Sequence, residues 1–559
     1  MLKLRTRLYS SLVRVRSDSL PDAPETTELT ALCGEEISFQ FAFWSAQALC
    51  APIRIAQEDV PVGEVQCFRV EEVPLSKATR GSIDDWYETT DDGGQCPDVL
   101  RPYGGEALLI RPETWYSIWI AVGCDTAGTA QIAVELDAGT TRLTRVFTLR
   151  VIAAELPEQK LIYTDWFHSD CLATYYNVPV FSEAHWDIIR RYVQTAADHG
   201  QNMILTPLFT PALDTEIGTE RPTVQLTDVT VLPASEGEGV QYAFGFVRLR
   251  RFVNLCHAAG IRYFELCHLF TQWGALHAPK IVDTQGQQLF GWDTDADSAE
   301  YAAFLRSFAA SLLPELRRLD ITENCFVHVS DEPSLQDIES YGRHAALIKE
   351  IFPGLRCIDA LSEYEFYQTG LIETPIPSNL AVEPFIGNVP HLWTYYCCGQ
   401  GDKYVSNRFM SMPLVRTRVL GLQLWKFRCE GFLHWGYNFW YSQLSKDKHI
   451  NPYEETAAGG AFPSGDAFVV YPGEEGRPLV SLRLKVFHEA LQDYRALSFL
   501  EGFIGYHNTL ALLEEGLSAP ITFRDVPHDP AWLLDTRERL NTVAASLYPL
   551  PAFDDPLPF

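Results

Sequence analysis

Two adjacent acids, Asp331 and Glu332, are the residues of this sequence best placed to do chemistry. They follow a short apolar run, Cys325–Val329, and Pro333 comes directly after them. Proline cannot continue a β ladder and keeps the residue before it extended, so this pattern predicts a buried strand that ends on two carboxyl groups. Carboxyl groups this close repel each other, which favours one of them holding a proton near neutral pH and acting as an acid.

A purely structural role for the two acids is the alternative. Ser334 followed by Asp337 is typical of a capping box at the start of a helix, and an acid beside a helix start often caps it. The choice between a chemical and a structural role depends on where the pair lies in the fold. In α/β barrels, catalytic residues lie where a parallel strand hands over to its helix.

Residues 160–500 carry the pattern of such a barrel. Apolar segments of strand length alternate with amphipathic helical segments such as Ser182–His199 and Ala299–Leu319, which is typical of βα units. Eight strands are expected, and the acids follow the fourth. The expected strands are Leu161–Tyr163, Asn202–Leu205, Ile261–Cys267, Cys325–Val329, Leu355–Ala360, Leu380–Phe385, Leu392–Cys397 and Gly431–Trp435. This count predicts a (β/α)₈ TIM-like barrel with insertions.

The two ends of the chain differ from this pattern. Residues 1–155 show strand-like alternation in Glu36–Phe43, Trp115–Val122 and Thr144–Val151, separated by Gly- and Asp-rich turns, which predicts a β-sandwich domain. Residues 501–559 are expected to form a helical C-terminal extension packed on the barrel. The predicted fold class is therefore multidomain: an N-terminal β-sandwich, a (β/α)₈ barrel and a short helical tail.

Aromatic and polar side chains gather at the predicted strand ends. Aromatic faces pack against the apolar faces of sugar rings, and a histidine or an amide can bind their hydroxyl groups. Each such residue taken singly is more often part of the core, but together they favour a pocket. The candidates for substrate binding are His268, Trp273, Tyr395, Trp435, Tyr437 and Asn438. Trp166 and Trp440 also lie at or near predicted strand ends.

Composition narrows the partners. The formal charge is −29, from 44 Lys and Arg against 73 Asp and Glu, so nucleic acid binding is excluded and a neutral substrate is favoured. No apolar run approaches the ~20 residues of a membrane helix, and the first residues do not resemble a signal peptide. The 13 cysteines lack metal-ligand spacing. We therefore expect a cytoplasmic protein with reduced thiols, no metal, no cofactor, and an oligosaccharide or glycoconjugate as its partner.

The adjacency of the acids indicates which glycosidase mechanism fits. Ordinary glycosidases place two carboxyl groups across the sugar, ~5–5.5 Å apart for retention and ~6.5–9.5 Å apart for inversion. Adjacent residues suit substrate assistance instead, where the 2-acetamido oxygen of the sugar is the nucleophile. Asp331 would orient the acetamide and Glu332 would be the general acid and base. The alternatives are a retaining glycosidase for plain sugars with Glu383 as nucleophile, and a non-catalytic carbohydrate-binding protein.

The Ser330-Asp331-Glu332-Pro333 motif resembles the Asp-Glu pair of glycoside hydrolase family 123. Further motifs match the family in the same order along residues 160–500. They are Trp393–Cys398, Asn407–Phe409, Gly431–Asn438, Ser464–Asp466, Tyr471–Gly473, Ser481–Leu484 and Asp493-Tyr494.

This resemblance implies a β-sandwich followed by a barrel, and an exo-acting β-N-acetylgalactosaminidase that retains configuration through an oxazoline. It implies that Asp331 orients the acetamide and that Glu332 is the acid/base. It also implies pocket positions for Tyr395, Trp435 and Tyr437. The segment 205–293 departs from the family pattern in its length, which predicts a reshaped substrate site.

Overall fold

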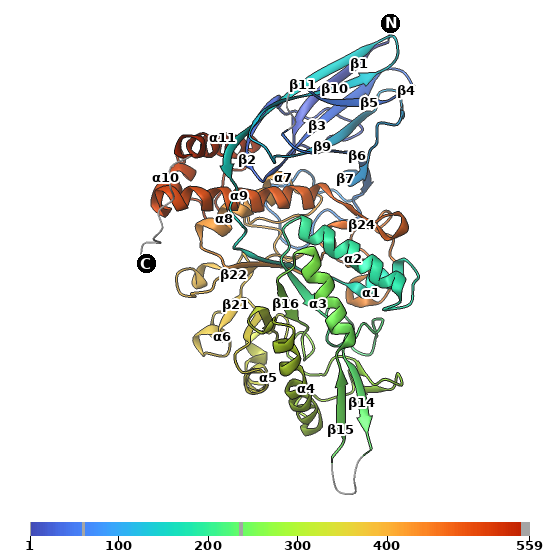
Figure 1. Cartoon of the computed structure of the whole chain (residues 1–559), viewed down its shortest axis with the longest axis vertical. Helices are drawn as coiled ribbons and strands as arrows, with labels where there is room; N and C mark the ends of the chain where they lie inside the picture. The colour runs from blue at the N-terminus through green and yellow to red at the C-terminus, as the bar shows by residue number, and fades with distance from the viewer. Residues whose placement is uncertain (1, 59–61, 234–238, 549–559) are drawn as a thin grey trace.

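The computed structural model of the chain describes residues 2–58, 62–233 and 239–548. A β-rich N-terminal region lies at one end of the molecule, and the barrel lies beneath it (Figure 1). A hairpin of β14 (Asp228–Leu232) and β15 (Gln241–Gly245) projects at the opposite end, away from the N-terminal sheets. This hairpin belongs to the long 205–293 segment.

The N-terminal region consists of two stacked sheets, as its alternating pattern predicts. Buried side chains of both sheets, including the stacked rings of Phe39 and Phe147, form a core between them. The five-stranded sheet has the order β1 (Leu4–Ser10), β3 (Glu36–Ser45), β9 (Trp115–Gly123), β6 (Val65–Pro74) and β7 (Gln95–Pro102). The four-stranded sheet has the order β2 (Glu28–Cys33), β11 (Arg142–Glu155), β10 (Gly128–Asp137) and β5 (Ile53–Glu58).

Eight parallel strands then form a nearly closed barrel, which confirms the predicted fold class. The sheet order is β21 (Thr374–Ile376), β20 (Arg356–Ala360), β19 (Cys325–Val327), β16 (Tyr263–Leu266), β13 (Met203–Thr206), β12 (Ile162–Asp165), β23 (Gly431–His434) and β22 (Trp393–Tyr395). Strands β21 and β22 have no ladder between them, and a single parallel bridge between Ser378 and Tyr395 lies across this gap.

The prediction of the sixth strand was wrong. Residues 374–376 form it, whereas the expected segment, 380–385, contains a short 3₁₀ turn at Glu383–Phe385. Pro375 explains the difference, because a proline within a strand usually argues against a strand. The structure tolerates it because β21 is an edge of the sheet and pairs only with β20.

Helices outside the barrel begin and end close to their predicted bounds. In α2 (Glu183–Asp198), the Ser182 hydroxyl accepts the N–H of His185 as an N-cap, and α3 (Val247–Ala259) ends at Gly260 with φ of 101°. The remaining long helices are α4 (Ala299–Arg318), α5 (Ile338–Ile351), α9 (Leu482–Ile504), α10 (Tyr506–Leu513) and α11 (Pro530–Leu547). Helix α11 lies beside β2 and β11 of the sandwich, and α9 contacts β7 (Figure 1). Among the described residues, no helix is both long and apolar enough to cross a membrane.

A buried ion pair joins the sandwich to the helical region. Asp98 on β7 accepts two hydrogen bonds of 2.9 Å from the Arg483 guanidinium on α9, and both side chains are fully buried. The Tyr471 hydroxyl donates to the same carboxylate at 2.7 Å. Removing one partner of a buried pair leaves the other charge without compensation, which is strongly destabilising.

We therefore expect Asp98→Ala to lower the free energy of unfolding by about 3–5 kcal/mol, measured by urea denaturation. Arg54→Ala is the matched control, because its pair with Asp137 lies at the surface with Arg54 64% exposed. Such exposed pairs contribute about 0–1 kcal/mol. Equal effects of the two substitutions would contradict a structural role for the buried pair.

Candidate active site

The backbone turns sharply at the two acids, just beyond the end of β19. Glu332 has a positive φ of 46°, and its N–H donates to the carbonyl of Ala360 at 2.9 Å. The carbonyl of Asp331 accepts the N–H of Trp273 at 3.0 Å. Left-handed backbone is uncommon for residues other than glycine, and such strain concentrates at functional sites. The turn lets two neighbours on the chain face the same space, which a regular strand forbids.

Neither acid caps the following helix. The capping box before α5 consists of Ser334 and Asp337. The Asp337 carboxylate accepts the N–H of Ser334 at 3.0 Å and its hydroxyl at 2.7 Å. The structural alternative that the sequence left open is therefore wrong. Asp331 and Glu332 are left available for another purpose.

Both acids line a cavity of about 570 Å³ at the barrel mouth. Four of the predicted aromatic residues line it as well: Trp166, Trp273, Tyr395 and Trp435. Trp273 is 52% exposed and Tyr395 is 6% exposed, so the first stands at the rim and the second in the wall. A concave site that combines aromatic walls with a few polar groups is typical of small-molecule and sugar binding.

Tyr395 holds Glu332 in place. Its hydroxyl donates to Oε1 of Glu332 at 2.6 Å. Burial raises the pKa of Tyr395 well above its ordinary value, and the charge of Glu332 raises it further, so the phenol stays protonated as a donor. Glu332 itself is exposed to the cavity, whereas Asp331 is half-buried beneath it.

Asp331 is the acid of the pair whose protonated form the fold favours. Burial raises the pKa of Asp331 well above its ordinary value, and the neighbouring charge of Glu332 adds to this, while the charge of His328 opposes it. The folded protein therefore holds a proton on Asp331 up to a higher pH than a free aspartic acid would.

Three predicted binding residues are not among those that line this cavity. Tyr437 is buried and donates to the carbonyl of Tyr192 at 3.0 Å. Asn438 is buried and bonds both backbone groups of His168, at 2.8 and 3.1 Å. Both side chains are therefore occupied by backbone contacts in the interior.

His268, the third, is 1% exposed and stacks on the ring of His328 with centroids 4.0 Å apart. Burial holds the pKa of His268 well below its ordinary value, and the charge of His328 lowers it further. His268, His328 and Asp359 bring possible metal-ligand atoms within 4.8 Å of one another. However, His328 contacts a carboxylate oxygen through each ring nitrogen, at 2.7 and 2.8 Å, which leaves no lone pair for a metal.

Glu383 lies apart from the cavity. Its carboxylate is 46% exposed and pairs with Arg524 at 2.8 Å, and it is not among the cavity-lining residues. Glu383 is therefore a solvated acid at the protein surface. This position removes the geometric basis for Glu383 as a nucleophile opposite Glu332.

Several cavity residues escaped the sequence analysis. Arg80, Gly81 and Ser82 reach the cavity from the N-terminal region, and Asp214 and Gln272 reach it from the long 205–293 segment. Burial raises the pKa of Asp214 to about 6. The unusual length of the 205–293 segment was the one signal in the sequence that drew attention to this region.

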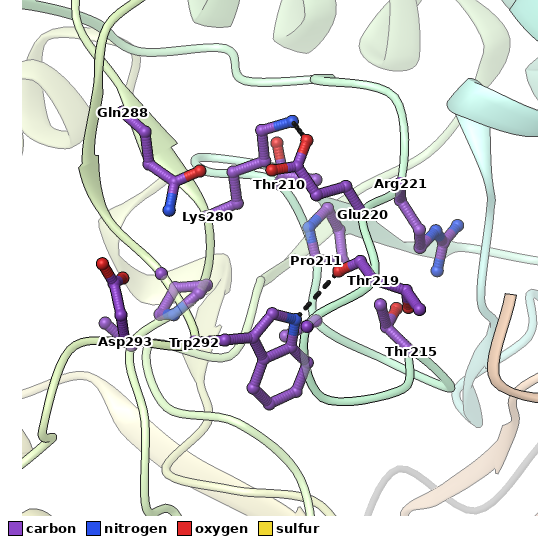
Figure 2. Close-up of a pocket in the computed structure, with 15 residues that line it drawn as sticks. Thr210, Pro211, Thr215, Thr219, Glu220, Arg221, Lys280, Gln288, Trp292 and Asp293 are labelled. Carbon is purple, nitrogen blue, oxygen red and sulfur yellow. Dashed lines mark hydrogen bonds and ion pairs between the residues drawn. The ribbon is translucent and has the colours of Figure 1, made fainter. Parts of the chain in front are cut away.

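A second, smaller cavity of about 190 Å³ lies beside the same segment (Figure 2). Lys280 pairs with Glu220 at 2.6 Å across it, and the indole N–H of Trp292 donates to the carbonyl of Thr219 at 3.0 Å. None of the described acids or aromatic residues of the main cavity lines it. The 210–215 loop separates the two, because Leu213 and Asp214 face the main cavity.

The site's motifs agree with one family. A family model described as "Glycoside hydrolase 123, catalytic domain" matches residues 166–500, more than half of the chain. The chain belongs to glycoside hydrolase family 123. It is accordingly a glycoside hydrolase, and Asp331 and Glu332 lie within the matched region. No curated protein matches the chain in sequence.

One solved structure shares the fold of the whole chain. A family 123 glycoside hydrolase from Clostridium perfringens, described in terms of glycolipid glycan hydrolysis, aligns with a TM-score of 0.75 at 14% identity, covering 98% of this chain and 99% of that one. This shows that the two-part architecture is shared over the whole length. A Parabacteroides merdae β-glucuronidase aligns with a TM-score of 0.31 at 11% identity, covering 88% of this chain and 52% of that one. The endo-β-1,4-mannanase of Thermotoga petrophila aligns with a TM-score of 0.35 at 11% identity, covering 60% and 77%.

Proposed function

We propose that this family 123 enzyme removes terminal β-linked N-acetylhexosamine, with GalNAc preferred, from oligosaccharides or glycoconjugates by substrate-assisted catalysis. The observation that carries the proposal is that two adjacent acids, Asp331 and Glu332, turn into one aromatic-walled cavity. Carboxyl groups on neighbouring residues leave the anomeric carbon to be attacked by a group of the substrate itself.

In the first step, the acetamide carbonyl oxygen attacks the anomeric carbon while Glu332 donates its proton to the glycosidic oxygen. The glycosidic bond breaks, the aglycone leaves, and an oxazoline forms as Asp331 takes the acetamide N–H proton. The acetamide N–H faces Asp331, and a donor there favours the ionised form of Asp331. Substrate binding thereby leaves Asp331 ready to accept the acetamide proton, while Glu332 supplies the proton that the leaving group needs.

In the second step, the ionised Glu332 takes a proton from water, and the water oxygen attacks the anomeric carbon. The carbon–oxygen bond of the oxazoline breaks, Asp331 returns its proton to the nitrogen, and the acetamide is restored. Two inversions at one carbon retain the β configuration. The Tyr395 hydroxyl, 2.6 Å from Glu332, keeps that carboxyl group aimed in both steps.

Two further observations support the proposal, one on the substrate class and one on the location of the protein. The description of the Clostridium perfringens enzyme concerns glycolipid glycans, and we propose the same kind of glycoconjugate for this chain. The 13 cysteines are all unpaired, which supports our proposal of a reducing, cytoplasmic location.

A panel of nitrophenyl glycosides tests the function. We expect turnover of β-GalNAc and β-GlcNAc glycosides and at least about 10³-fold slower turnover of the matched galactoside and glucoside, which lack the nucleophile. Fluorine atoms on the acetyl group withdraw electrons from the carbonyl oxygen, so each added fluorine should lower kcat further. Equal rates with and without the acetamide would refute substrate assistance.

One alternative keeps a specific observation in its favour. Asp214 lines the same cavity, and a carboxyl group with a pKa of about 6 is half ionised near that pH. A retaining glycosidase for plain sugars with Asp214 as nucleophile would cleave the galactoside or glucoside in the same panel. It would also form a covalent adduct on Asp214 with a 2-fluoroglycoside, detectable by peptide mass spectrometry.

A further inference from the structure

Three charged side chains from adjacent strands meet beneath the catalytic acids. Glu265 on β16 and Asp359 on β20 flank His328, which directly follows β19. The two ring nitrogens of His328 lie 2.7 Å from Glu265 Oε1 and 2.8 Å from Asp359 Oδ1, and all three side chains are fully buried. We call these residues the Glu265–His328–Asp359 cluster.

The contacts of this cluster favour a cationic imidazole. Both ring nitrogens face carboxylate oxygens at hydrogen-bond distance, and a doubly protonated ring donates to both of them. Burial alone would lower the pKa of His328, but the hydrogen bonds and charges of Asp359 and Glu265 outweigh it and raise the pKa to about 10. A buried cation between two anions is stable only while all three partners remain in place.

Asp359 fixes the backbone that carries the catalytic acids. Its carboxylate accepts the N–H of Val329 at 3.1 Å and, more weakly, that of Ser330 at 3.4 Å. The Tyr341 hydroxyl donates to the same carboxylate at 2.7 Å. Val329 and Ser330 immediately precede Asp331, so the cluster sets the direction in which the chain leaves the barrel.

Glu265 fixes the opposite wall of the cavity. Its Oε1 accepts the indole N–H of Trp166 at 2.6 Å, and its Oε2 accepts the Thr164 hydroxyl at 2.7 Å. Trp166 lines the catalytic cavity. One rigid set of charge-assisted hydrogen bonds therefore connects the acids to the aromatic ring that the sugar would contact.

Acidic side chains from the neighbouring elements surround His328. Glu265 and Asp359 lie on either side, and Asp331 lies above. His268 stacks on the ring and is neutral, and the Trp166 ring meets it edge-on. The positive charge of His328 lowers the pKa of Asp331, while the charges of Asp359 and Glu265 raise it. The protonation of His328 thus acts directly on the catalytic pair.

We propose that Glu265, His328 and Asp359 are positioning residues for the reaction, which hold the Asp331-Glu332 pair and Trp166 in register and place a permanent cation beneath Asp331. This role rests on the proposed function of the pair. It adds to that function a buried row of charged side chains, Glu265, His328 and Asp359, which we call the charge relay. These side chains touch no substrate, and no sequence motif marks them.

Asp359→Asn in the full chain tests the relay, because asparagine keeps the size and one acceptor but removes the charge. On whichever glycoside the panel shows to be cleaved, we expect kcat to fall on the order of 10²-fold with KM nearly unchanged. With one carboxylate left, His328 should lose its proton nearer the ordinary histidine value of about 6.5. A new alkaline limb in kcat/KM should appear there, with activity falling as pH rises.

Glu265→Gln should produce the same new limb, since it removes the other carboxylate. Tyr341→Phe is the matched control: it removes a hydrogen bond to Asp359 without changing any charge, so it should add no limb. Selective ¹⁵N labelling of histidine gives a readout that needs no turnover. One imidazolium signal should persist above about pH 8 in the wild-type protein and titrate at lower pH in both charge-removing variants.

A loss of activity that is equal at every pH in both charge-removing variants would overturn the relay and leave a packing role. A His328 signal that is already neutral at pH 8 in the wild-type protein would overturn it as well. If no glycoside is cleaved, the proposed function fails, whereas the ¹⁵N titration still decides the charge state of the cluster.

Discussion

Glu332→Gln is expected to lower kcat by about 10²–10⁴-fold on glycosides with poor leaving groups. The reason is that the amide cannot donate a proton to the departing oxygen, while it keeps the size of the side chain and its contact with the Tyr395 hydroxyl. A dinitrophenyl leaving group needs no proton, so its departure should be affected far less. Steady-state kinetics on a series of aryl glycosides measures this, and the dependence on leaving-group pKa should steepen in the variant.

Azide provides the second half of the same experiment. As an anion it needs no general base, so it should restore turnover of the dinitrophenyl substrate by Glu332→Gln and form the β-glycosyl azide. Glu383→Gln is the matched control, because Glu383 pairs with Arg524 outside the cavity, and its kinetics should equal those of the wild type. A uniform loss across all leaving groups, or inactivation by Glu383→Gln, would show that the acid has been assigned to the wrong residue.

The barrel was predictable because its strands are buried on both faces. Such strands appear in a sequence as short apolar runs, and seven of the eight were found at their observed places. The strand that was missed is the sixth, Thr374–Ile376. It carries a proline at its centre and is only three residues long. It becomes a strand because β20 offers it a partner, and no local pattern encodes that partner.

The position of Asp331 and Glu332 at the barrel mouth was predictable for a different reason. A strand that ends on two acids before a proline places charge where a barrel has its mouth, whatever the rest of the chain does. Arg80 and Asp214 could not be found in this way. They reach the cavity from another domain and from a long loop, so only the folded chain brings them near Glu332.

Glu265 and Asp359 lie between these extremes. Each is a single acid inside a short strand, Tyr263–Leu266 and Arg356–Ala360, and is flanked there by apolar neighbours. Buried charges are rare unless paired, so two such acids predict a cation between them, and His328 at the end of the intervening strand is the obvious one. The signal was present in the sequence; what it required was the order of the strands in the sheet.

Asp331→Asn should separate catalysis from stability. Without the carboxylate, nothing accepts the acetamide proton as charge develops in the ring closure, and we expect kcat on β-GalNAc glycosides to fall about 10²–10³-fold. A thiazoline analogue of the oxazoline should also bind less tightly, because its protonated ring loses its counter-ion. Inhibition constants and kcat measured on one preparation test both expectations.

The same substitution should make the fold more stable at neutral pH. Burial and the charge of Glu332 raise the pKa of Asp331 in the folded protein well above its value in the unfolded chain. The folded state therefore binds more protons between those two pKa values, and the free energy of unfolding falls as pH rises through that window. Asparagine removes this penalty, so the thermal midpoint of Asp331→Asn should exceed that of the wild type at pH 7 and match it near pH 3.

Asp402→Asn is the control for this gain, because it removes an acid that lines the same cavity but is not adjacent to Glu332. A rise in thermal midpoint that is equal for the two variants would mean that general charge repulsion in an acidic protein causes it. A gain specific to Asp331 would show that the enzyme keeps a destabilising carboxyl group at this position because its function requires a strong proton acceptor there. The two acids would then differ in kind: Glu332 is held by Tyr395 for proton transfer, and Asp331 is kept costly to ionise until a substrate supplies the missing hydrogen-bond donor.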